Sequence, residues 1–207
     1  MEEKKVVKVE DIKKEAEEKG CPVQRALYYV EEFLAGPMCG RCFPCAMGSY
    51  EAKLRLQAII DCQGSEDDIM TLKRIADDML ISSFCKKGKD TARFMLEWLD
   101  SGVFDEHVNG ICPEAECKAY IRYKIIPERC IMCGECKAVC RYHAIIGQKR
   151  KSKYSTGDIP FEIRDKRCTC CGECIDVCPT GAIVLIESKT GKIIEEREPK
   201  EAEEAVK

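Results

Sequence analysis

Histidine is scarce in this chain: only two of the 207 residues are histidines, and only one is a tryptophan. No Ser-His-Asp set, paired carboxylate site or nucleophile elbow can be recognised, so we expect no catalytic residues on the chain itself. No apolar run is long enough to cross a bilayer, and the charged start MEEKKVVKVEDIKKEAEEKG lacks the apolar segment of a signal peptide. These absences predict a soluble, cytoplasmic protein that binds no membrane.

Two further kinds of ligand are not expected. The formal net charge of -3 counts every thiol as neutral, and ionised thiols would make it more negative, which argues against a nucleic-acid partner. Neither a G-x-G-x-x-G motif nor a phosphate loop occurs, so we expect no FMN and no NAD on this chain.

Cysteine, by contrast, is abundant, with 17 residues. In a reducing compartment, clustered cysteines hold metal or do redox chemistry more often than they form disulfides. The pattern C-x2-C-x2-C-x3-C occurs at 130–140 and again at 168–178, a shift of 38 residues. Each copy predicts a short strand, a cysteine loop, a helical turn and a second strand, which together form a duplicated βαβ unit. The spacing lets three thiolates of one loop hold three corners of an iron-sulfur cubane.

Residues 121–187 resemble the two-cluster bacterial ferredoxins, in which the fourth cysteine of each run ligates the other cluster. The resemblance implies two [4Fe-4S] clusters: one bound by Cys130, Cys133, Cys136 and Cys178, the other by Cys168, Cys171, Cys174 and Cys140. A pair of structural zinc sites is the alternative, which such compact quartets disfavour. Cys170 lies outside this register and is interpreted as a spare thiol. Arg141 replaces the proline that the family usually has after the fourth cysteine; it either raises the potential of a nearby cluster or is a solvated arginine.

A third set of cysteines begins upstream, in GPMCGRCFPCAMG, where Cys39, Cys42 and Cys45 are again two residues apart. Cys62 and Cys85 are the next candidates for a fourth ligand. CGRCFPCAMG followed by SFCKKG resembles the iron-sulfur domain of the flavin-carrying, NADH-oxidising subunit of respiratory complex I and of its hydrogenase and formate dehydrogenase relatives. That resemblance, over residues 22–102, implies a [4Fe-4S] cluster on Cys39, Cys42, Cys45 and Cys85, and leaves Cys62 as a packing residue.

The helical pattern of this region agrees with that resemblance. Apolar residues recur at helical spacing in RALYYVEEFL, SYEAKLRLQAII, SEDDIMTLKRIADDML and DTARFMLEWL, which predicts a four-helix bundle. Ser65 and Asp68 are placed as a capping box at the start of the third helix. The stripe of Phe94, Met95 and Trp98 is expected to belong to the core.

Between the two modules, His107, Cys112 and Cys117 form a row of soft ligands. A related segment lies between the same modules in larger electron-bifurcating hydrogenase subunits, which the chain resembles through this linker as well. We expect either a zinc ion, with Cys21 or Cys170 as the fourth ligand, or loose thiols and a surface histidine. Downstream, the basic loop at 147–160 is interpreted as solvated, the alternative being a docking site for an acidic partner.

The expected fold class is α+β: a small helical bundle with one [4Fe-4S] cluster, followed by a duplicated ferredoxin domain with two. The expected parts are a charged N-terminal extension (1–21), a helical iron-sulfur domain (22–102), a linker (103–120), a ferredoxin domain (121–190) and an acidic tail (191–207).

The motifs predict an oxygen-sensitive electron-transfer subunit of a flavin-dependent oxidoreductase complex, similar to the C-terminal half of the flavin subunit of electron-bifurcating enzymes. The partners that the resemblance implies are a flavin- and NAD(P)-binding subunit and other oxidoreductase subunits, with a soluble ferredoxin as a further candidate. An independent polyferredoxin and a redox-inactive zinc scaffold are the alternatives.

Overall fold

The computed structural model describes residues 8–150 and 159–200, so the two ends of the chain and the middle of the basic loop lie outside the described residues. The chain divides into two compact units between Tyr120 and Ile121. In this part of the chain no helix is both long enough and apolar enough to cross a membrane.

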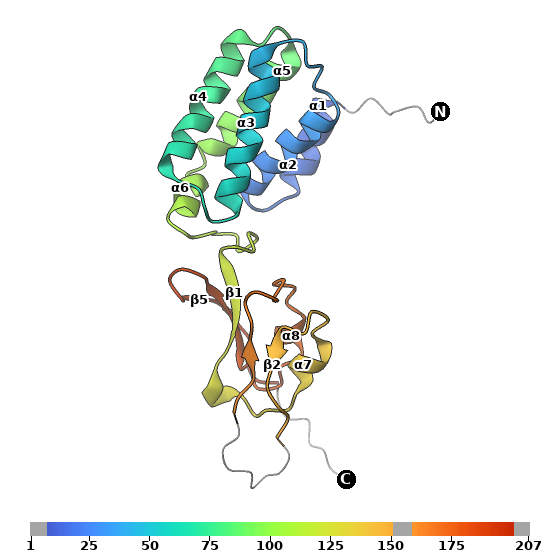
Figure 1. Cartoon of the computed structure of the whole chain (residues 1–207), viewed down its shortest axis with the longest axis vertical. Coiled ribbons are helices and arrows are strands. Elements are labelled where there is room, and N and C mark those ends of the chain that lie inside the picture. Colours follow the sequence, from blue (N-terminus) through green and yellow to red (C-terminus); the bar gives the residue numbers. More distant parts are fainter. Residues whose placement is uncertain (1–7, 151–158, 201–207) are drawn as a thin grey trace, which may run out of the picture. The chain divides into compact units, whose positions relative to one another are not determined.

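The described residues of the first unit form a bundle of six helices (Figure 1). They are α1 (Val9–Glu17), α2 (Pro22–Ala35), α3 (Phe43–Ile60), α4 (Glu66–Ser82), α5 (Lys86–Leu99) and α6 (Val103–Val108). Helix α2 packs against α1, α3 and α5, and α4 packs against α3 and α5. The four helices expected from the apolar spacing are therefore present as α2 to α5. Helix α1 lies within the segment expected to be a charged extension, and it buries Val9, Ile12 and Ala16.

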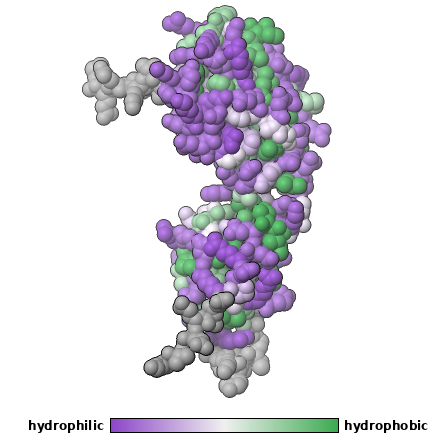
Figure 2. Space-filling model, turned by 180° about the vertical axis from the view of Figure 1, so that it is seen from behind, coloured by the Kyte–Doolittle hydropathy of each residue, from purple (hydrophilic) through white to green (hydrophobic). Residues whose placement is uncertain are grey.

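The core of the bundle is aromatic at its centre. Tyr29 is completely buried and lies edge-on to Phe94 and Trp98, with ring centroids 5.3 and 5.8 Å away. Met95 is also buried, so the expected assignment of this stripe to the core is confirmed. Large apolar side chains also reach the surface of both units, where they interrupt the hydrophilic surface as green patches in Figure 2.

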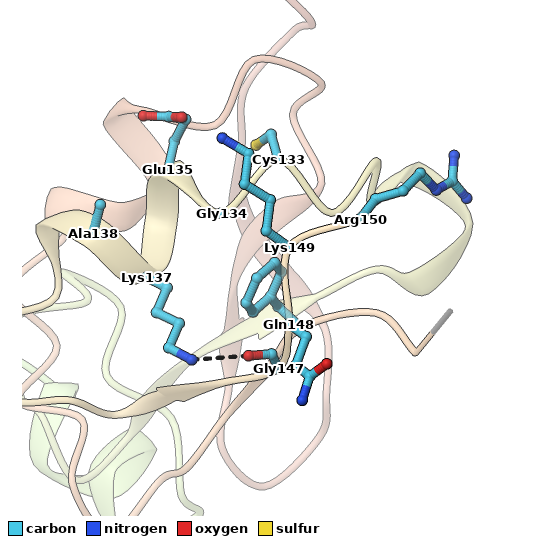
Figure 3. Close-up of a pocket in the computed structure, with 10 residues that line it drawn as sticks. Cys133, Gly134, Glu135, Lys137, Ala138, Gly147, Gln148, Lys149 and Arg150 are labelled. Carbon is cyan, nitrogen blue, oxygen red and sulfur yellow. Dashed lines mark hydrogen bonds between the residues drawn. The ribbon is translucent and has the colours of Figure 1, made fainter. Parts of the chain in front are cut away.

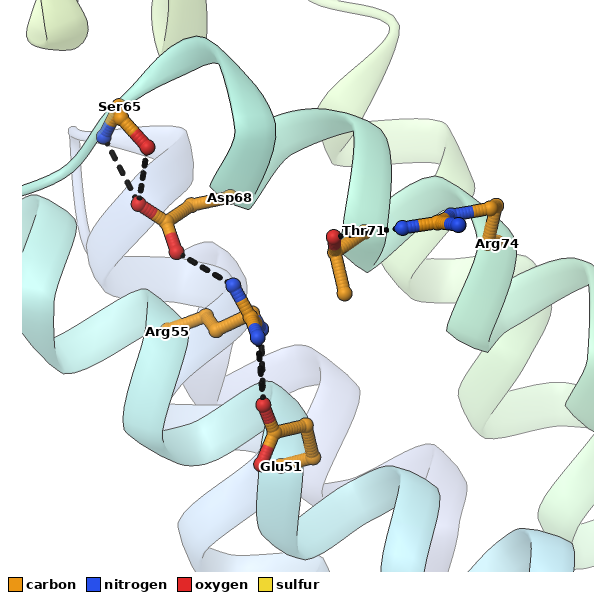
Figure 4. A network of polar contacts seen from close by, with 6 residues as sticks. All are labelled: Glu51, Arg55, Ser65, Asp68, Thr71 and Arg74. Carbon is orange, nitrogen blue, oxygen red and sulfur yellow. Dashed lines mark hydrogen bonds and ion pairs between the residues drawn. The ribbon is translucent and has the colours of Figure 1, made fainter.

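The turn between α3 and α4 is held by a polar network (Figure 4). The backbone N–H and the hydroxyl of Ser65 both donate to the Asp68 carboxylate, at 2.8 and 2.7 Å, which confirms the capping box. The other oxygen of Asp68 accepts from Arg55 on α3 at 2.7 Å, and Arg55 also pairs with Glu51 at 2.8 Å. These hydrogen bonds outweigh the effect of burial and lower the pKa of Asp68. The network thus ties the start of α4 to the side of α3.

The second unit combines short strands with short helices. Its elements are β1 (Ile121–Ile125), the 3-10 turn η1 (Pro127–Arg129), α7 (Glu135–Val139), β2 (Ile145–Ile146), β3 (Glu162–Ile163), α8 (Glu173–Asp176), β4 (Ile183–Glu187) and β5 (Ile193–Glu196). All strand pairs among the described residues are antiparallel: β1 with β4, β4 with β5, and β2 with β3. Strands of one half of the sequence repeat therefore pair with strands of the other half, so the two halves interlock. Strand β5 lies in the segment expected to be an acidic tail.

Together the two units mix helices with small sheets, which agrees with the α+β class. In each half of the second unit a glycine with positive φ precedes the helix: Gly134 (φ 85°) before α7 and Gly172 (φ 83°) before α8. A side chain would strain this left-handed backbone, so glycine lets the chain turn directly from the cysteine loop into the helix.

Candidate metal-cluster sites

The first set of thiols lies where two helices of the bundle begin. Cys42 is the N-cap of α3, and Cys85 is the N-cap of α5. The positive ends of both helix dipoles therefore favour negative charge at this end of the bundle. Cys45, in the first turn of α3, is buried, and burial together with the nearby thiols of Cys42, Cys85 and Cys39 raises its pKa to about 12. The structure thus brings together Cys39, Cys42, Cys45 and Cys85, named here the helical quartet.

Close packing around the helical quartet depends on Gly88 in α5. A Cβ atom at this position would lie 3.1 Å from the Cys45 sulfur and 2.7 Å from the Ser83 hydroxyl. That hydroxyl is buried and has no hydrogen-bond partner among the described residues. Four thiols with an unused hydroxyl donor beside them suit an iron-sulfur cluster, whose sulfur atoms accept hydrogen bonds. Cys39 and Cys85 are exposed, so the site opens to solvent.

The second unit has two further groups of four thiols, and each lines its own pocket. Pocket A is lined by Cys130, Cys133, Cys136 and Cys178, and pocket B by Cys140, Cys168, Cys171 and Cys174. In both, three thiols come from one cysteine loop and the first turn of the helix after it, and the fourth comes from the other half of the repeat. The Ala182 N–H donates to the Cys178 sulfur and the Ala144 N–H to the Cys140 sulfur, each at 3.3 Å.

Burial affects the thiols of both pockets in the same way. It raises the pKa of Cys136 to about 11 and that of Cys174 to about 12, and neighbouring thiols add to the effect. Burying several negative thiolates together is unfavourable unless positive charge neutralises them. A cationic iron core supplies that charge, so both pockets fit the group that their cysteines imply.

A fourth group of ligands lies in the helical unit. Cys21, His107, Cys112 and Cys117 are all buried, and their ligand atoms lie within 4.8 Å of one another. We name them the buried tetrad. The His107 Nε2 atom is 3.4 Å from the sulfurs of both Cys21 and Cys117. The Nδ1–H of His107 donates to the Val103 carbonyl at 2.7 Å, which leaves Nε2 free to act as a ligand.

The surroundings of the buried tetrad fix its shape. The backbone N–H groups of Gly20 and Cys21 donate to the Glu116 carboxylate at 2.8 and 2.9 Å. The Tyr120 ring packs edge-on against His107, with a centroid distance of 4.8 Å. Burial opposes charge on His107, but hydrogen bonds to the neighbouring thiols of Cys112 and Cys21 outweigh it and raise the pKa to about 10. Hydrogen bonds from the other thiols, led by Cys117, lower the pKa of Cys112.

Two remaining cysteines lie outside these groups. Cys62 was expected to be a packing residue, and that is wrong: it is exposed just beyond the end of α3, with a positive φ of 59°. The chain turns sharply there, so the side chain leaves the buried face of α3. Cys170 belongs to the second unit, where its sulfur lies 3.6 Å from the Ile121 carbonyl oxygen. Cys21 is therefore the cysteine that joins His107 in this structure.

A more open pocket adjoins the loop of pocket A (Figure 3). Lys137 crosses it to donate to the Gly147 carbonyl at 2.8 Å, while Lys149 lies over Gly134 beside Cys133. The basic residues at the start of the 147–160 loop therefore lie next to the cysteine loop of pocket A. The rest of that basic run, Lys151 and Lys153, lies outside the described residues.

Comparison with known proteins identifies both units. Residues 25–107 match the NADH-ubiquinone oxidoreductase-F iron-sulfur binding region, and residues 122–182 match the 4Fe-4S dicluster domain. The NADP-reducing hydrogenase subunit HndC of Solidesulfovibrio fructosivorans is 29% identical over 138 residues, which cover 65% of this chain and 28% of that protein. The F subunit of the NADH-quinone oxidoreductase of Streptomyces coelicolor is 34% identical over 94 residues, which cover 44% of this chain and 21% of that protein.

The chain thus joins an iron-sulfur region of the oxidoreductase F type to a dicluster domain, as its motifs predict, and it is a 4Fe-4S protein. It spans less than a third of the length of either curated relative.

Proposed function

We propose that this chain is an electron-transfer subunit of an oxidoreductase complex and that it carries single electrons through three [4Fe-4S] clusters. The observation that carries the proposal is the presence of three separate groups of four thiols, each gathered in one place. When bound, each cluster takes up and releases one electron. The chain itself holds each cluster by four thiolates and buries part of each set, which keeps the ligands in place between oxidation states.

The ligands of each cluster follow from these groups. The helical quartet would hold the first cluster, through Cys39, Cys42, Cys45 and Cys85. Pocket A would hold the second, through Cys130, Cys133, Cys136 and Cys178, and pocket B the third, through Cys168, Cys171, Cys174 and Cys140. Two of the thiols in the helical quartet are exposed, so this site is accessible to a redox partner.

The partner that we propose is a flavin- and NAD(P)-binding subunit of the same complex. The curated relatives are a subunit of an NADP-reducing hydrogenase and a subunit of NADH-quinone oxidoreductase, and no dinucleotide motif occurs in this sequence. The exposed apolar side chains of α3 follow one face of the helix from its first turn, where Cys45 of the helical quartet also lies: they are Phe43, Met47, Tyr50 and Leu54. An apolar stripe of this kind suits a subunit interface. Electron bifurcation by the complex is a further proposal, which rests on the resemblance to bifurcating enzymes.

The buried tetrad is proposed to bind one zinc ion. Three thiols and an imidazole nitrogen form a common structural zinc set, and the carbonyl of Val103 holds the imidazole in the tautomer that zinc requires. Zinc has no redox chemistry, so its role would be to fix the linker against the start of α2.

Metal analysis of the anaerobically purified chain tests the cluster and zinc proposals together. We expect about twelve irons, twelve sulfides and one zinc per chain. Cys85→Ser should remove about four irons, whereas the matched control Cys62→Ser should remove none. Several zinc ions without sulfide would instead support the zinc scaffold, and the relay would be refuted.

The partner proposal needs a different measurement. Gel filtration of an anaerobic extract should place the chain in a complex that contains a flavoprotein, at a larger size than the purified chain alone. If the chain elutes from the extract as a free small protein, the independent polyferredoxin is favoured. A complex with no flavoprotein would remove the basis for proposing bifurcation.

A further inference from the structure

Pockets A and B are built from the same positions of the repeat. Ile125 lines pocket A, and the residue 38 positions later, Ile163, lines pocket B. In the other direction, Ile145 lines pocket B and Ile183, also 38 positions later, lines pocket A. Each pocket thus serves as the internal control for the other, because a difference between them is a difference in side chains on a shared framework.

Two of these matched positions differ in hydrogen-bonding capacity. Pocket A is lined by Phe161 and Ile131, which have no polar side-chain atom. At the matching positions, pocket B is lined by Tyr123 and Thr169, each with a hydroxyl. The repeat therefore places two side-chain donors at one cluster site and none at the same two positions of the other.

Both hydroxyls are in place to act on a group held in pocket B. The hydroxyl of Thr169 is buried and has no hydrogen-bond partner among the residues that the structure describes. A buried hydroxyl without a partner is unfavourable, so it is expected to find one when the site is filled. Tyr123 is 8% exposed, and its hydroxyl oxygen lies 3.2 Å from the position that a Cβ atom of Gly172 would take, directly at the cysteine loop.

We propose that Tyr123 and Thr169 donate hydrogen bonds to sulfur atoms of the cluster in pocket B and make it the higher-potential cluster of the two. The inference rests on the proposed function, because it requires a cluster in each pocket. Reduction adds one negative charge to a cluster, and a hydrogen-bond donor at its sulfur stabilises that charge, which raises the reduction potential. An electron that enters the second unit then resides mainly in pocket B, which gives the relay a direction.

Three other differences between the pockets stay the same in the variants used below, so they cannot produce the expected shifts. Arg141 lies beside pocket B, but its side chain is 80% exposed and pairs with Glu173 at 3.5 Å, so solvent and the carboxylate screen its charge. Thr180 lines pocket A, but its hydroxyl donates to the Arg129 carbonyl at 2.7 Å. Cys170 has Met132 as its counterpart; its thiol donates to the Ile121 carbonyl and also interacts with the Cys168 sulfur of pocket B, a contact that Tyr123→Phe, Thr169→Val and Phe161→Tyr leave in place.

The test is a potentiometric titration of the full chain, loaded with its clusters and followed by EPR. The reduction step of the cluster in the helical quartet is identified because Cys85→Ser lacks it. The two remaining reduction steps, called waves below, belong to the second unit. Tyr123→Phe combined with Thr169→Val removes both hydroxyls with little change of shape. We expect it to lower the upper of these two potentials enough to shift the electron distribution about tenfold, which is about 59 mV for a one-electron couple.

Phe161→Tyr is the reciprocal variant, because it gives pocket A the donor that pocket B has. It should raise the lower of the two potentials and leave the upper one unchanged. Both variants reduce the difference between the two reduction potentials of the second unit. The double variant lowers the upper potential, whereas Phe161→Tyr raises the lower one. If the full iron content is retained and the upper potential stays where it was after both hydroxyls are removed, or if Phe161→Tyr moves the upper wave, the inference is overturned.

Iron analysis of the same samples distinguishes failure of the proposed function from failure of the roles proposed for Tyr123 and Thr169. A wild-type chain that lacks iron and sulfide for two clusters in the second unit would refute the proposed function. A chain with its full iron content and unmoved potentials would refute only the roles of Tyr123 and Thr169. If one single variant fails to retain its clusters, the other single variant of the pair still gives the measurement.

Discussion

Removing Cys21 from the buried tetrad should destabilise the helical unit strongly, and the size of the effect can be estimated from the structure. Cys21 precedes α2, whereas the other three ligands lie between residues 107 and 117. The zinc ion proposed above, shared by Cys21 and His107, would close a loop of 86 residues. In the chain-entropy model, a cross-link over a loop of this length contributes about 4–5 kcal/mol.

Cys21→Ser removes this cross-link and leaves three ligands. Because serine is nearly the same size as cysteine, packing in the core changes little. For a unit of this size, each kcal/mol corresponds to about 4 °C in melting temperature, so we expect a decrease of at least about 10 °C. Circular dichroism at 222 nm reports mainly on the helices of the first unit, and zinc should be measured on the same anaerobic sample.

Two controls make this prediction specific to zinc. Cys62→Ser changes an exposed thiol that belongs to none of the four groups, and it should melt like the wild type. A zinc chelator should lower the melting temperature of the wild type but should have little further effect on Cys21→Ser. A Cys21→Ser protein that keeps its stability, or a wild-type protein that is insensitive to zinc removal, would refute the proposed zinc site.

Three further predictions concern other parts of the chain. Gly88→Ala places a methyl group 3.1 Å from the Cys45 sulfur, so about four irons should be lost on analysis, whereas the neighbouring Lys89→Ala should keep them all. Asp68→Asn removes the carboxylate of the capping box and should cost about 1 kcal/mol at pH 7 by chemical denaturation. Folding lowers the pKa of Asp68, so the stability that its carboxylate contributes is present above about pH 4 and is lost as the pH falls through the folded pKa. If the loss of stability in Asp68→Asn grows toward acid pH, the network is contradicted. Finally, iodoacetamide should label the cluster-loaded chain first at Cys62, as located by peptide mass spectrometry, and equal labelling of the quartet thiols would argue against bound clusters.

Local patterns in the sequence predicted the parts of this structure that local interactions determine. The capping box of Ser65 and Asp68 is confirmed because its partners are three residues apart. The helices α2, α4 and α5 are present because each repeats its apolar residues at the spacing of one buried face, whereas α3 also carries apolar residues on an exposed face. The three runs of cysteines were visible for the same reason, since each run places three thiols in one short segment.

Interactions between distant segments could not be predicted in this way. Cys21 has no neighbour in sequence that suggests a metal site, and only the packing of α2 against α6 brings it to His107. Spacing alone therefore left Cys21 and Cys170 as equal candidates. The same applies to α1, whose buried face consists of only three apolar residues among many charges, and to β5, which is held by its pairing with β4.

The placement of the buried tetrad separates its role from that of the helical quartet. The quartet lies at the start of α3, whereas Tyr120, which packs on His107, donates to the Ile59 carbonyl at the end of α3. Helix α3 runs along the length of the bundle (Figure 1). At 1.5 Å per residue, the 18 residues of α3 separate these ends by about 27 Å. A metal ion at the far end would therefore act on how the bundle is joined to the segment that follows it, and the redox chemistry of the bundle would be confined to the end where α3 and α5 begin.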